Sequence, residues 1–134
     1  SHALRGFQGQ ADIGVHLNLT LGRPLTDMPL LAPGGEFPSI GEIAKGALAR
    51  RLPVEEIAGE IDAQLDAFEQ ATDRRPDFVD GHQHVHGLAG VRRALLAVLR
   101  ERYAKGPKPW LRDPSDSLAR IVRRRRNMQK ALAV

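Results

Sequence analysis

The chain has 134 residues and a net charge of +4; 42% of its residues are hydrophobic but only 4% are aromatic. This composition is typical of one soluble globular domain with an aliphatic core. Cysteine is absent, which excludes disulfides, thiolate metal sites and cysteine nucleophiles. No apolar run approaches the roughly 20 residues that span a bilayer, and the opening "SHALRGFQGQ" lacks a signal-peptide pattern. We therefore expect a cytoplasmic protein that does not associate with membranes.

The first predicted element is a strand over Ala11–Thr20, "ADIGVHLNLT". Its residues alternate between an aliphatic face and a face of small and polar groups with His16 at its centre. The polar face suits a site better than a core. Residues 21–39 follow and are dense in proline and glycine, which predicts a long loop. Loops of this length commonly serve a function such as covering a site.

Two helices are predicted next. Ser39 can cap the first helix, "IGEIAKGALARR", with Glu42 as its capping-box partner. The second begins near Pro53, a favourable first-turn residue, and ends before residues 73–76. One apolar stripe at helical spacing runs along this second helix. Its members are Ile57, Ile61, Leu65 and Phe68.

The segment "PDFVDGHQHVHG" predicts a short buried strand, Phe78–Asp80, that runs into a histidine-bearing turn. A third helix over Leu88–Tyr103, a short strand in "PWLRD" and a last helix from Ser115 complete the order. Strands that alternate with helices in this way predict an α/β protein with parallel strands.

The arginine-rich run "RIVRRRRN", Arg120–Asn127, allows two interpretations. It could bind the phosphate backbone of a nucleic acid, or it could be the solvated face of a helix. We favour the helix face, because no aromatic residues interleave with these arginines and no nucleic-acid fold motif accompanies them.

The histidines are the candidate site. His82 comes at the carboxyl end of a predicted parallel strand, where ligands bind in α/β sheets, and His16 lies on the polar face of another strand. Imidazoles from two strands are a natural pair of metal ligands. His82, His84 and His86 share one face if their segment is extended, whereas only one or two of them reach a common ion if the chain turns.

The alternative is a polar turn whose histidines satisfy backbone carbonyls, and three histidines in five residues beside Asp80 favour a metal or catalytic site over it. Histidine and carboxylate without cysteine fit Zn²⁺, Mn²⁺, Fe²⁺ or Co²⁺, and Mg²⁺ if carboxylates and water dominate.

Two motifs, "IGVHLNLTLGRPL" (Ile13–Leu25) and "PDFVDGHQHVH" (Pro76–His86), together resemble the YdjC-like carbohydrate deacetylases, which include chitooligosaccharide and hopanoid-associated deacetylases. The intervening loop "LLAPGGEFPS" and the helix after it also look like this family, and the resemblance covers Ala11 to the end of the chain. It implies a distorted (β/α) barrel that holds Mg²⁺ or Zn²⁺ through one aspartate and two histidines. The reaction it implies is hydrolysis of an N-acetyl group from an amino sugar.

Carried over by position, the resemblance makes His16 and His82 the metal ligands. Asp80 would lie beside His82, orient it and take part in catalysis. We expect His84, His86 and Arg112 near the substrate. Arg112 could instead pair with Asp113 or Asp116, and Trp110 fits a core residue as well as a sugar-stacking platform.

Family members begin with a strand that ends in an Asp-Asp-Phe-Gly-type motif, which "SHALRGFQGQ" does not match. We therefore expect residues 1–134 to be one domain, the middle portion of a longer barrel, and the fold to be a partial (β/α) barrel. Such a fragment could be non-catalytic and form a homo-oligomer, because an incomplete barrel exposes sheet edges.

Overall fold

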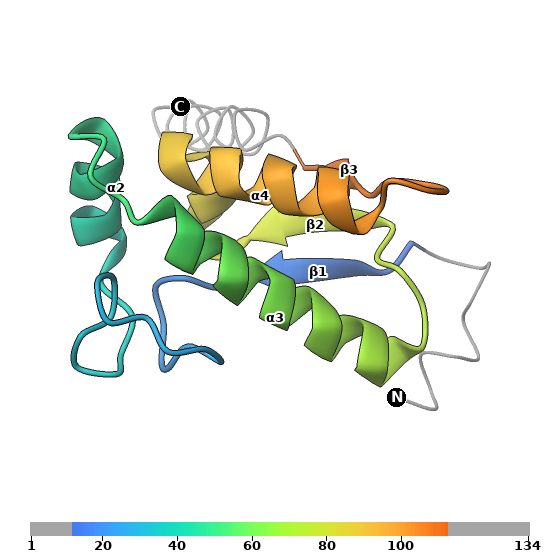
Figure 1. The fold of residues 1–134 in the computed structure, drawn as a ribbon, viewed down its shortest axis with the longest axis horizontal. Coiled ribbons are helices and arrows are strands. Elements are labelled where there is room, and N and C mark those ends of the chain that lie inside the picture. Colours follow the sequence, from blue (N-terminus) through green and yellow to red (C-terminus); the bar gives the residue numbers. More distant parts are fainter. Residues whose placement is uncertain (1–11, 113–134) are drawn as a thin grey trace, which may run out of the picture.

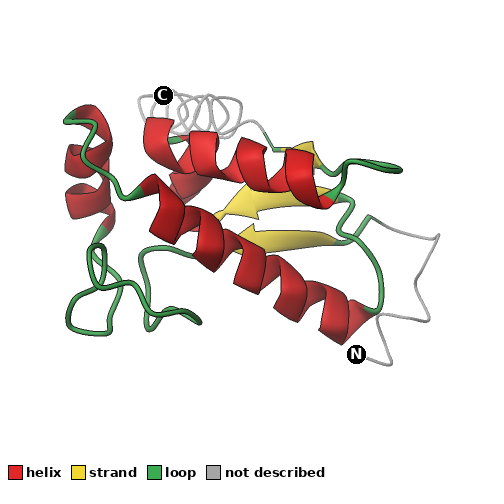
Figure 2. Cartoon of the chain, viewed as in Figure 1, coloured by secondary structure: helices red, strands yellow, loops and turns green. Residues whose placement is uncertain are grey.

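A computed structural model of the chain describes residues 12–112. Within these residues it contains three strands, three α-helices and one 3₁₀ turn, and the helices lie over one face of the sheet (Figures 1 and 2). In chain order the elements are β1 (Gly14–Leu17), α2 (Ile40–Leu48), α3 (Val54–Thr72), β2 (Phe78–Gly81), η1 (His82–Gly87), α4 (Ala89–Arg102) and β3 (Trp110–Leu111). The last predicted helix, from Ser115, and the arginine run Arg120–Asn127 lie outside the described residues.

The three strands form one sheet in the order β1-β2-β3, and both pairs are parallel. This confirms the predicted α/β class with parallel strands. Three strands do not close a barrel, so the partial (β/α) barrel stays a prediction, as does the homo-oligomer. Helices α3 and α4 pack side by side over one face of the sheet, and α2 lies beside the start of α4 (Figure 1).

The hydrophobic core lies between the sheet and these two helices. The aliphatic face of β1 and its extension contribute Val15, Leu17 and Leu19, all of which are buried. The predicted stripe of α3 is also buried, apart from Phe68, which is partly buried. From α4 the buried residues are Val91, Ala94, Leu95, Val98 and Leu99. The aliphatic periodicities in the sequence therefore identified the inward faces of three elements.

The first strand is shorter than the sequence predicted, because Asn18 begins a turn. Its side-chain Oδ1 accepts hydrogen bonds from the backbone N–H groups of Thr20 and Leu21, at 3.1 and 3.0 Å. Asparagine side chains compete with the strand ladder in this way. The alternation from Ile13 to Leu19 therefore continues into a turn that directly follows the strand.

The ends of the helices follow local rules. Ser39 caps α2 by accepting a hydrogen bond from the backbone N–H of Glu42 at 3.2 Å, as predicted. The helix ends at Leu48, three residues earlier than expected, and Arg50 has a positive φ of 55°. Among residues 12–112, no helix is long and apolar enough to cross a membrane.

The sheet face opposite the helices carries an aromatic layer below the polar residues. Phe78 and Trp110 are register partners and their rings stack at 4.9 Å. Gly14 completes this layer, because a Cβ at this position would lie 2.3 Å from the Phe78 ring. Trp110 is 52% exposed, so within the described residues it is not part of the buried core.

Candidate functional site

A row of polar side chains crosses the open face of the sheet near the carboxyl ends of the strands. His16 on β1 is the register partner of Asp80 on β2. Arg112 directly follows β3 and donates its backbone N–H to Val79. The Arg112 guanidinium lies 3.1 Å from the Asp80 carboxylate, and His16 Nδ1 lies 3.8 Å from the same oxygen. The parallel register therefore brings residues from three strands into contact.

His82 completes this group at the end of β2. Its Nδ1 atom lies 3.4 Å from His16 Nε2, and the two rings meet edge to face. Two nitrogen ligands at the ordinary zinc–nitrogen distance and the tetrahedral angle lie about 3.3 Å apart. The two imidazoles therefore fit one metal ion as a pair of ligands. His16 is 57% exposed, so its ring is open to solvent.

The turn η1 decides which of the other histidines reach this position. Gln83 and His84 both have positive φ angles, 55° and 58°. Consecutive non-glycine residues in this left-handed region are uncommon and cost free energy. The chain therefore turns sharply after His82 instead of continuing as a strand, and His82 is the histidine of this segment that meets His16.

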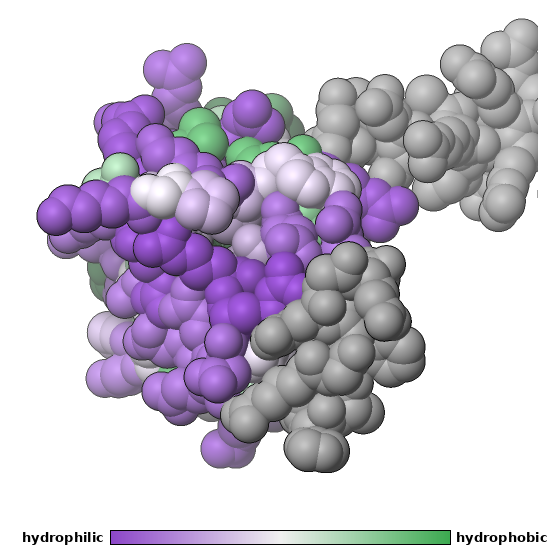
Figure 3. All heavy atoms as spheres, turned by 90° about the vertical axis from the view of Figure 1, so that its right-hand side faces the viewer, coloured by the Kyte–Doolittle hydropathy of each residue, from purple (hydrophilic) through white to green (hydrophobic). Residues whose placement is uncertain are grey.

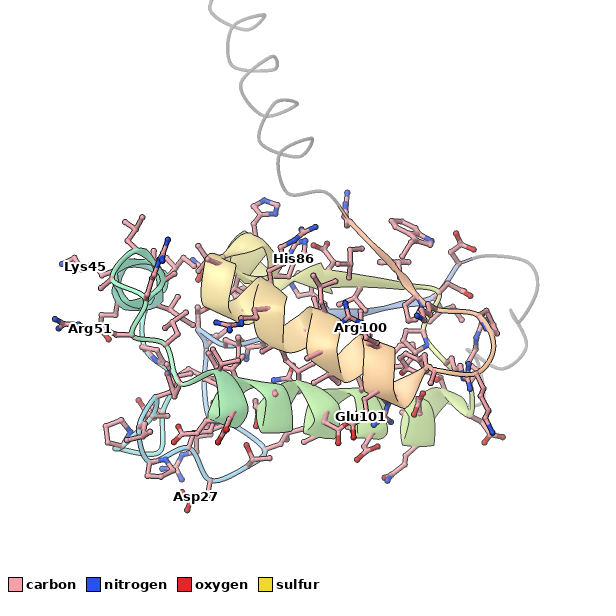
Figure 4. The ribbon with its side chains drawn as sticks, turned by 45° about the horizontal axis from the view of Figure 1, so that its top comes forward. Asp27, Lys45, Arg51, His86, Arg100 and Glu101 are labelled. Atoms are coloured by element: carbon pink, nitrogen blue, oxygen red, sulfur yellow. The ribbon has the colours of Figure 1, made fainter. Side chains whose placement is uncertain are left out.

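His86 is buried beneath the turn, with 0% of its surface exposed. Its Nε2 donates to the backbone carbonyl of Arg112 at 2.7 Å, and its Nδ1 lies 3.8 Å from Asp80. Gly81 permits this packing, because a Cβ there would lie 2.6 Å from His86 Nδ1. Figure 4 shows His86 close to the amino-terminal end of α4. The buried His86 side chain binds the backbone of Arg112 and lies near Asp80, and its contact with substrate stays a prediction.

Asp80 is the centre of the polar contacts. Among residues 12–112, Asp80 pairs with Arg112 at 3.1 Å and lies 3.8 Å from a ring nitrogen of His16 and of His86, whereas no contact joins it to His82. Its other contact is a hydrogen bond of 2.7 Å from the backbone N–H of Gly81. Two neighbouring atoms, Nδ1 of His84 and Nδ1 of His86, are buried without a hydrogen-bond partner. The pairing of polar groups in the site is therefore incomplete.

The other end of the sheet has a different character. A hollow at the amino ends of the strands is lined mainly by charged residues and proline, with Trp110 at one side, and contains no histidine. Figure 3 views this end and shows a mostly hydrophilic surface. Within residues 12–112, no group of three or more His, Cys, Asp or Glu side chains is placed to hold a metal ion. This holds for the carboxyl ends too, where His16 and His82 offer two candidate ligands and further ligands would have to come from elsewhere.

Three residues that support the site were not predicted from the sequence. Thr20 donates its hydroxyl to the Gln83 side chain at 2.9 Å, which ties the segment after β1 to the histidine turn. Gln64 on α3 hydrogen-bonds the backbone of Asn18. These contacts join positions 46 to 63 residues apart, so no local pattern could have identified them.

Comparison with known proteins identifies chitooligosaccharide deacetylases among the relatives of this chain. Chitooligosaccharide deacetylases of Yersinia pestis (strain Pestoides F) and Yersinia pseudotuberculosis are 37% identical over 94 residues, which cover 67% of this chain and 35% of theirs. This chain therefore spans about a third of the length of these relatives.

A crystal structure from Enterococcus faecalis V583, described as a "putative cellobiose-phosphate cleavage protein", is also similar. It superposes with a TM-score of 0.61 at 28% identity, over 84% of this chain and 42% of its own. The sequence model of the YdjC-like protein family matches residues 1–133, nearly the whole chain. The chain therefore belongs to the YdjC-like protein family, as its two motifs predicted.

Proposed function

We propose that this chain is part of a metal-dependent carbohydrate deacetylase, a hydrolase that removes the N-acetyl group from an amino sugar or chitooligosaccharide. The observation that carries the proposal is the 3.4 Å separation of His16 Nε2 and His82 Nδ1 at the carboxyl ends of two neighbouring parallel strands. The names of the Yersinia relatives supply the reaction and the class of substrate.

In this proposal His16 and His82 hold the divalent cation. Imidazole nitrogens suit Zn²⁺, whereas Mg²⁺ prefers oxygen ligands, so this pair favours zinc. A bound cation polarises the amide carbonyl and lowers the pKa of a water molecule. The remaining ligands would come from water, substrate or a further carboxylate, because the described residues offer only the two histidines as a pair.

Asp80 is the catalytic carboxylate of the proposal. Its Oδ2 lies 3.8 Å from His16 Nδ1, so it favours the tautomer that carries a proton on Nδ1 and leaves Nε2 free to bind metal. Arg112 contacts the same oxygen at 3.1 Å and holds the carboxylate in place. An ionised carboxylate beside the two histidines can accept a proton from the attacking water, as a general base does.

Substrate contact falls to Arg112 and His84. The Arg112 side chain is half-exposed, and among residues 12–112 the side chain that it contacts is Asp80. Its remaining N–H groups can donate to sugar hydroxyls or to the acetyl oxygen. His84 is partly exposed in the turn that follows His82, and we assign it a contact with the substrate.

The first experiment measures metal content by ICP-MS on the purified chain after equilibration with Zn²⁺. It compares the wild type with His16→Ala, His82→Ala and His2→Ala, where His2 lies outside the described residues and serves as the control histidine. We expect one zinc per chain in the wild type and in His2→Ala, and none in the other two variants. A wild type without zinc would refute the metal site.

The same four proteins are then assayed for acetate release from N-acetylated chitooligosaccharides. We expect release by the wild type and by His2→Ala, with loss in both site variants. Zinc binding without acetate release would confirm the metal pair but refute deacetylation by this chain alone.

A further inference from the structure

Helix α3 turns a polar edge toward the segment that follows β1. Glu56, Glu60 and Gln64 are spaced four residues apart, so they lie on one side of the helix. Glu60 is 0% exposed, which is unusual for a carboxylate. It accepts hydrogen bonds from the backbone N–H of Leu25 and from both the N–H and the hydroxyl of Thr26, at 2.7 to 3.1 Å. The helix thereby fixes the loop beyond the first motif.

The Glu60 carboxylate also fixes the orientation of the Gln64 amide. An ionised carboxylate only accepts hydrogen bonds, so the Gln64 NH₂ group must face it, at 2.8 Å. The same nitrogen donates to the backbone carbonyl of Asn18 at 2.7 Å, and the amide oxygen accepts from the Asn18 N–H at 3.0 Å. The Gln64 side chain therefore pairs with Asn18 on both sides, as a neighbouring strand would.

Asn18 is the first residue after β1 and lies two positions after His16. Its side chain organises the turn that brings the Thr20 hydroxyl to Gln83, the neighbour of His82. A continuous set of hydrogen bonds thus runs from the buried Glu60 through Gln64 to the backbone of Asn18, and from the turn after Asn18 to the side chain of Gln83. Each polar atom of the Gln64 amide is used in it.

We propose that Gln64, oriented by Glu60, is a positioning residue that holds the carboxyl end of β1 so that His16 faces His82. This inference rests on the proposed function of the histidine pair and adds a residue that touches neither metal nor substrate. Without the Gln64 amide, the backbone N–H and C=O groups of Asn18 lose their hydrogen-bond partners on α3. The end of β1 is then free to move away from this helix.

The test uses Gln64→Met, which keeps the length of the side chain but removes the amide. Its matched control is Glu56→Met, one turn before Glu60, since Glu56 bonds the backbone of Leu30 and Leu31 and does not contact Asn18. The readout is the NMR cross-peak (NOE) between the ring protons of His16 and His82 in the metal-free chain. We expect this cross-peak in the wild type and in Glu56→Met, and its loss in Gln64→Met.

Zinc titration of the same proteins gives a second readout. We expect the Kd of Gln64→Met to rise about tenfold, in the range found when residues that support metal ligands are replaced, while the Kd of Glu56→Met stays within about twofold. Any of three results would overturn the positioning role of Gln64. The cross-peak could be undiminished in Gln64→Met, it could be lost equally in Glu56→Met, or it could be absent in the wild type.

The two proposals fail separately. A wild type that shows the cross-peak but binds no zinc refutes the metal site, while the cross-peak still decides the role of Gln64. If Gln64→Met does not fold, Glu60→Gln takes its place, because it keeps the volume and replaces one of the two acceptor oxygens, which together bind Leu25, Thr26 and Gln64, with an NH₂ donor. We expect a weakened cross-peak in Glu60→Gln, and an unchanged one would overturn the proposal.

Discussion

Two clusters of charged and polar side chains differ in how completely they are paired. The first, the Arg102 cluster, lies between α3 and α4 and consists of Asp62, Asp66, Glu69, Arg102 and Tyr103. The second, the histidine cluster, lies at the carboxyl ends of the strands and consists of His16, Asp80, His82, His84, His86 and Arg112. In the first, Arg102 contacts all three carboxylates, and Tyr103 donates its hydroxyl to Glu69 at 2.8 Å. In the second, two buried nitrogens have no partner.

The difference in pairing indicates that the Arg102 cluster stabilises the fold and that the histidine cluster serves a function. A buried polar atom without a hydrogen bond costs about 1–3 kcal/mol, and Gln83 and His84 add the cost of two positive φ angles. The Arg102 cluster carries no such cost and joins two helices. Costs of this kind concentrate at sites where a ligand or a reaction requires them. The incomplete pairing is therefore a second reason to place the function at the histidines.

The first prediction tests the stabilising role of the Arg102 cluster. Arg102→Met should lower the free energy of unfolding by about 2 kcal/mol, because it leaves the partly buried Glu69 and the Tyr103 hydroxyl without their cation. The contribution of Asp62 and Asp66 is small, since both are more than half exposed. Urea unfolding monitored by circular dichroism measures the change.

Arg100→Met is the matched control for this prediction. Arg100 lies on the same helix, is exposed, and forms no ion pair with a carboxylate among residues 12–112 (Figure 4). Its replacement should change stability by less than about 0.5 kcal/mol. Zinc affinity should not change in either variant. A loss of zinc binding in Arg102→Met would show that the two clusters are coupled, and the division into a stabilising and a functional cluster would then be wrong.

The second prediction concerns Asp80, the carboxylate of the histidine cluster. Asp80→Asn should raise the Kd for zinc about tenfold, or about 1.4 kcal/mol, because His16 loses the charge that favours its metal-binding tautomer. Stability should change less than in Arg102→Met, since the asparagine side chain can still accept from the Gly81 N–H. Isothermal titration and urea unfolding on one sample measure both quantities.

Asp27→Asn controls for the loss of one negative charge, because Asp27 is exposed on the loop after β1 (Figure 4). It should leave both quantities unchanged. If Asp80→Asn destabilised the fold as much as Arg102→Met and left zinc affinity intact, Asp80 would belong with the stabilising residues.

The parts of the site that were predictable depend on periodicity. The alternation around His16 put this residue on the face opposite Val15 and Leu17, and the structure agrees. The short apolar run before His82 predicted a strand that ends there, which placed His82 at a carboxyl end. Because the carboxyl ends of parallel strands lie at the same edge of a sheet, the sequence alone predicts that His16 and His82 lie close together.

The rest depends on contacts between distant segments. The sequence places His86 beside His84, but its partner is the Arg112 carbonyl 26 residues away, and this contact explains its burial. Glu60 and Gln64 belong to an amphipathic helix on which charged residues ordinarily face solvent. Nothing local distinguishes a buried carboxylate that binds a loop from an exposed one, so the support of the site by α3 was not predictable.

The third prediction tests whether the Arg102 cluster is as closely packed as its contacts indicate. Burial, together with the hydrogen bond to Glu69, raises the pKa of Tyr103 from 10.0 to about 12. The folded state therefore favours the neutral phenol, and this contribution to stability is fully present below pH 10 and is lost as the pH rises through 12. The chain has one tyrosine, so tyrosinate absorbance reports on this residue alone. Glu69→Gln should move the midpoint back toward 10, whereas a wild-type midpoint at 10 would mean that the phenol is solvated and the cluster is open.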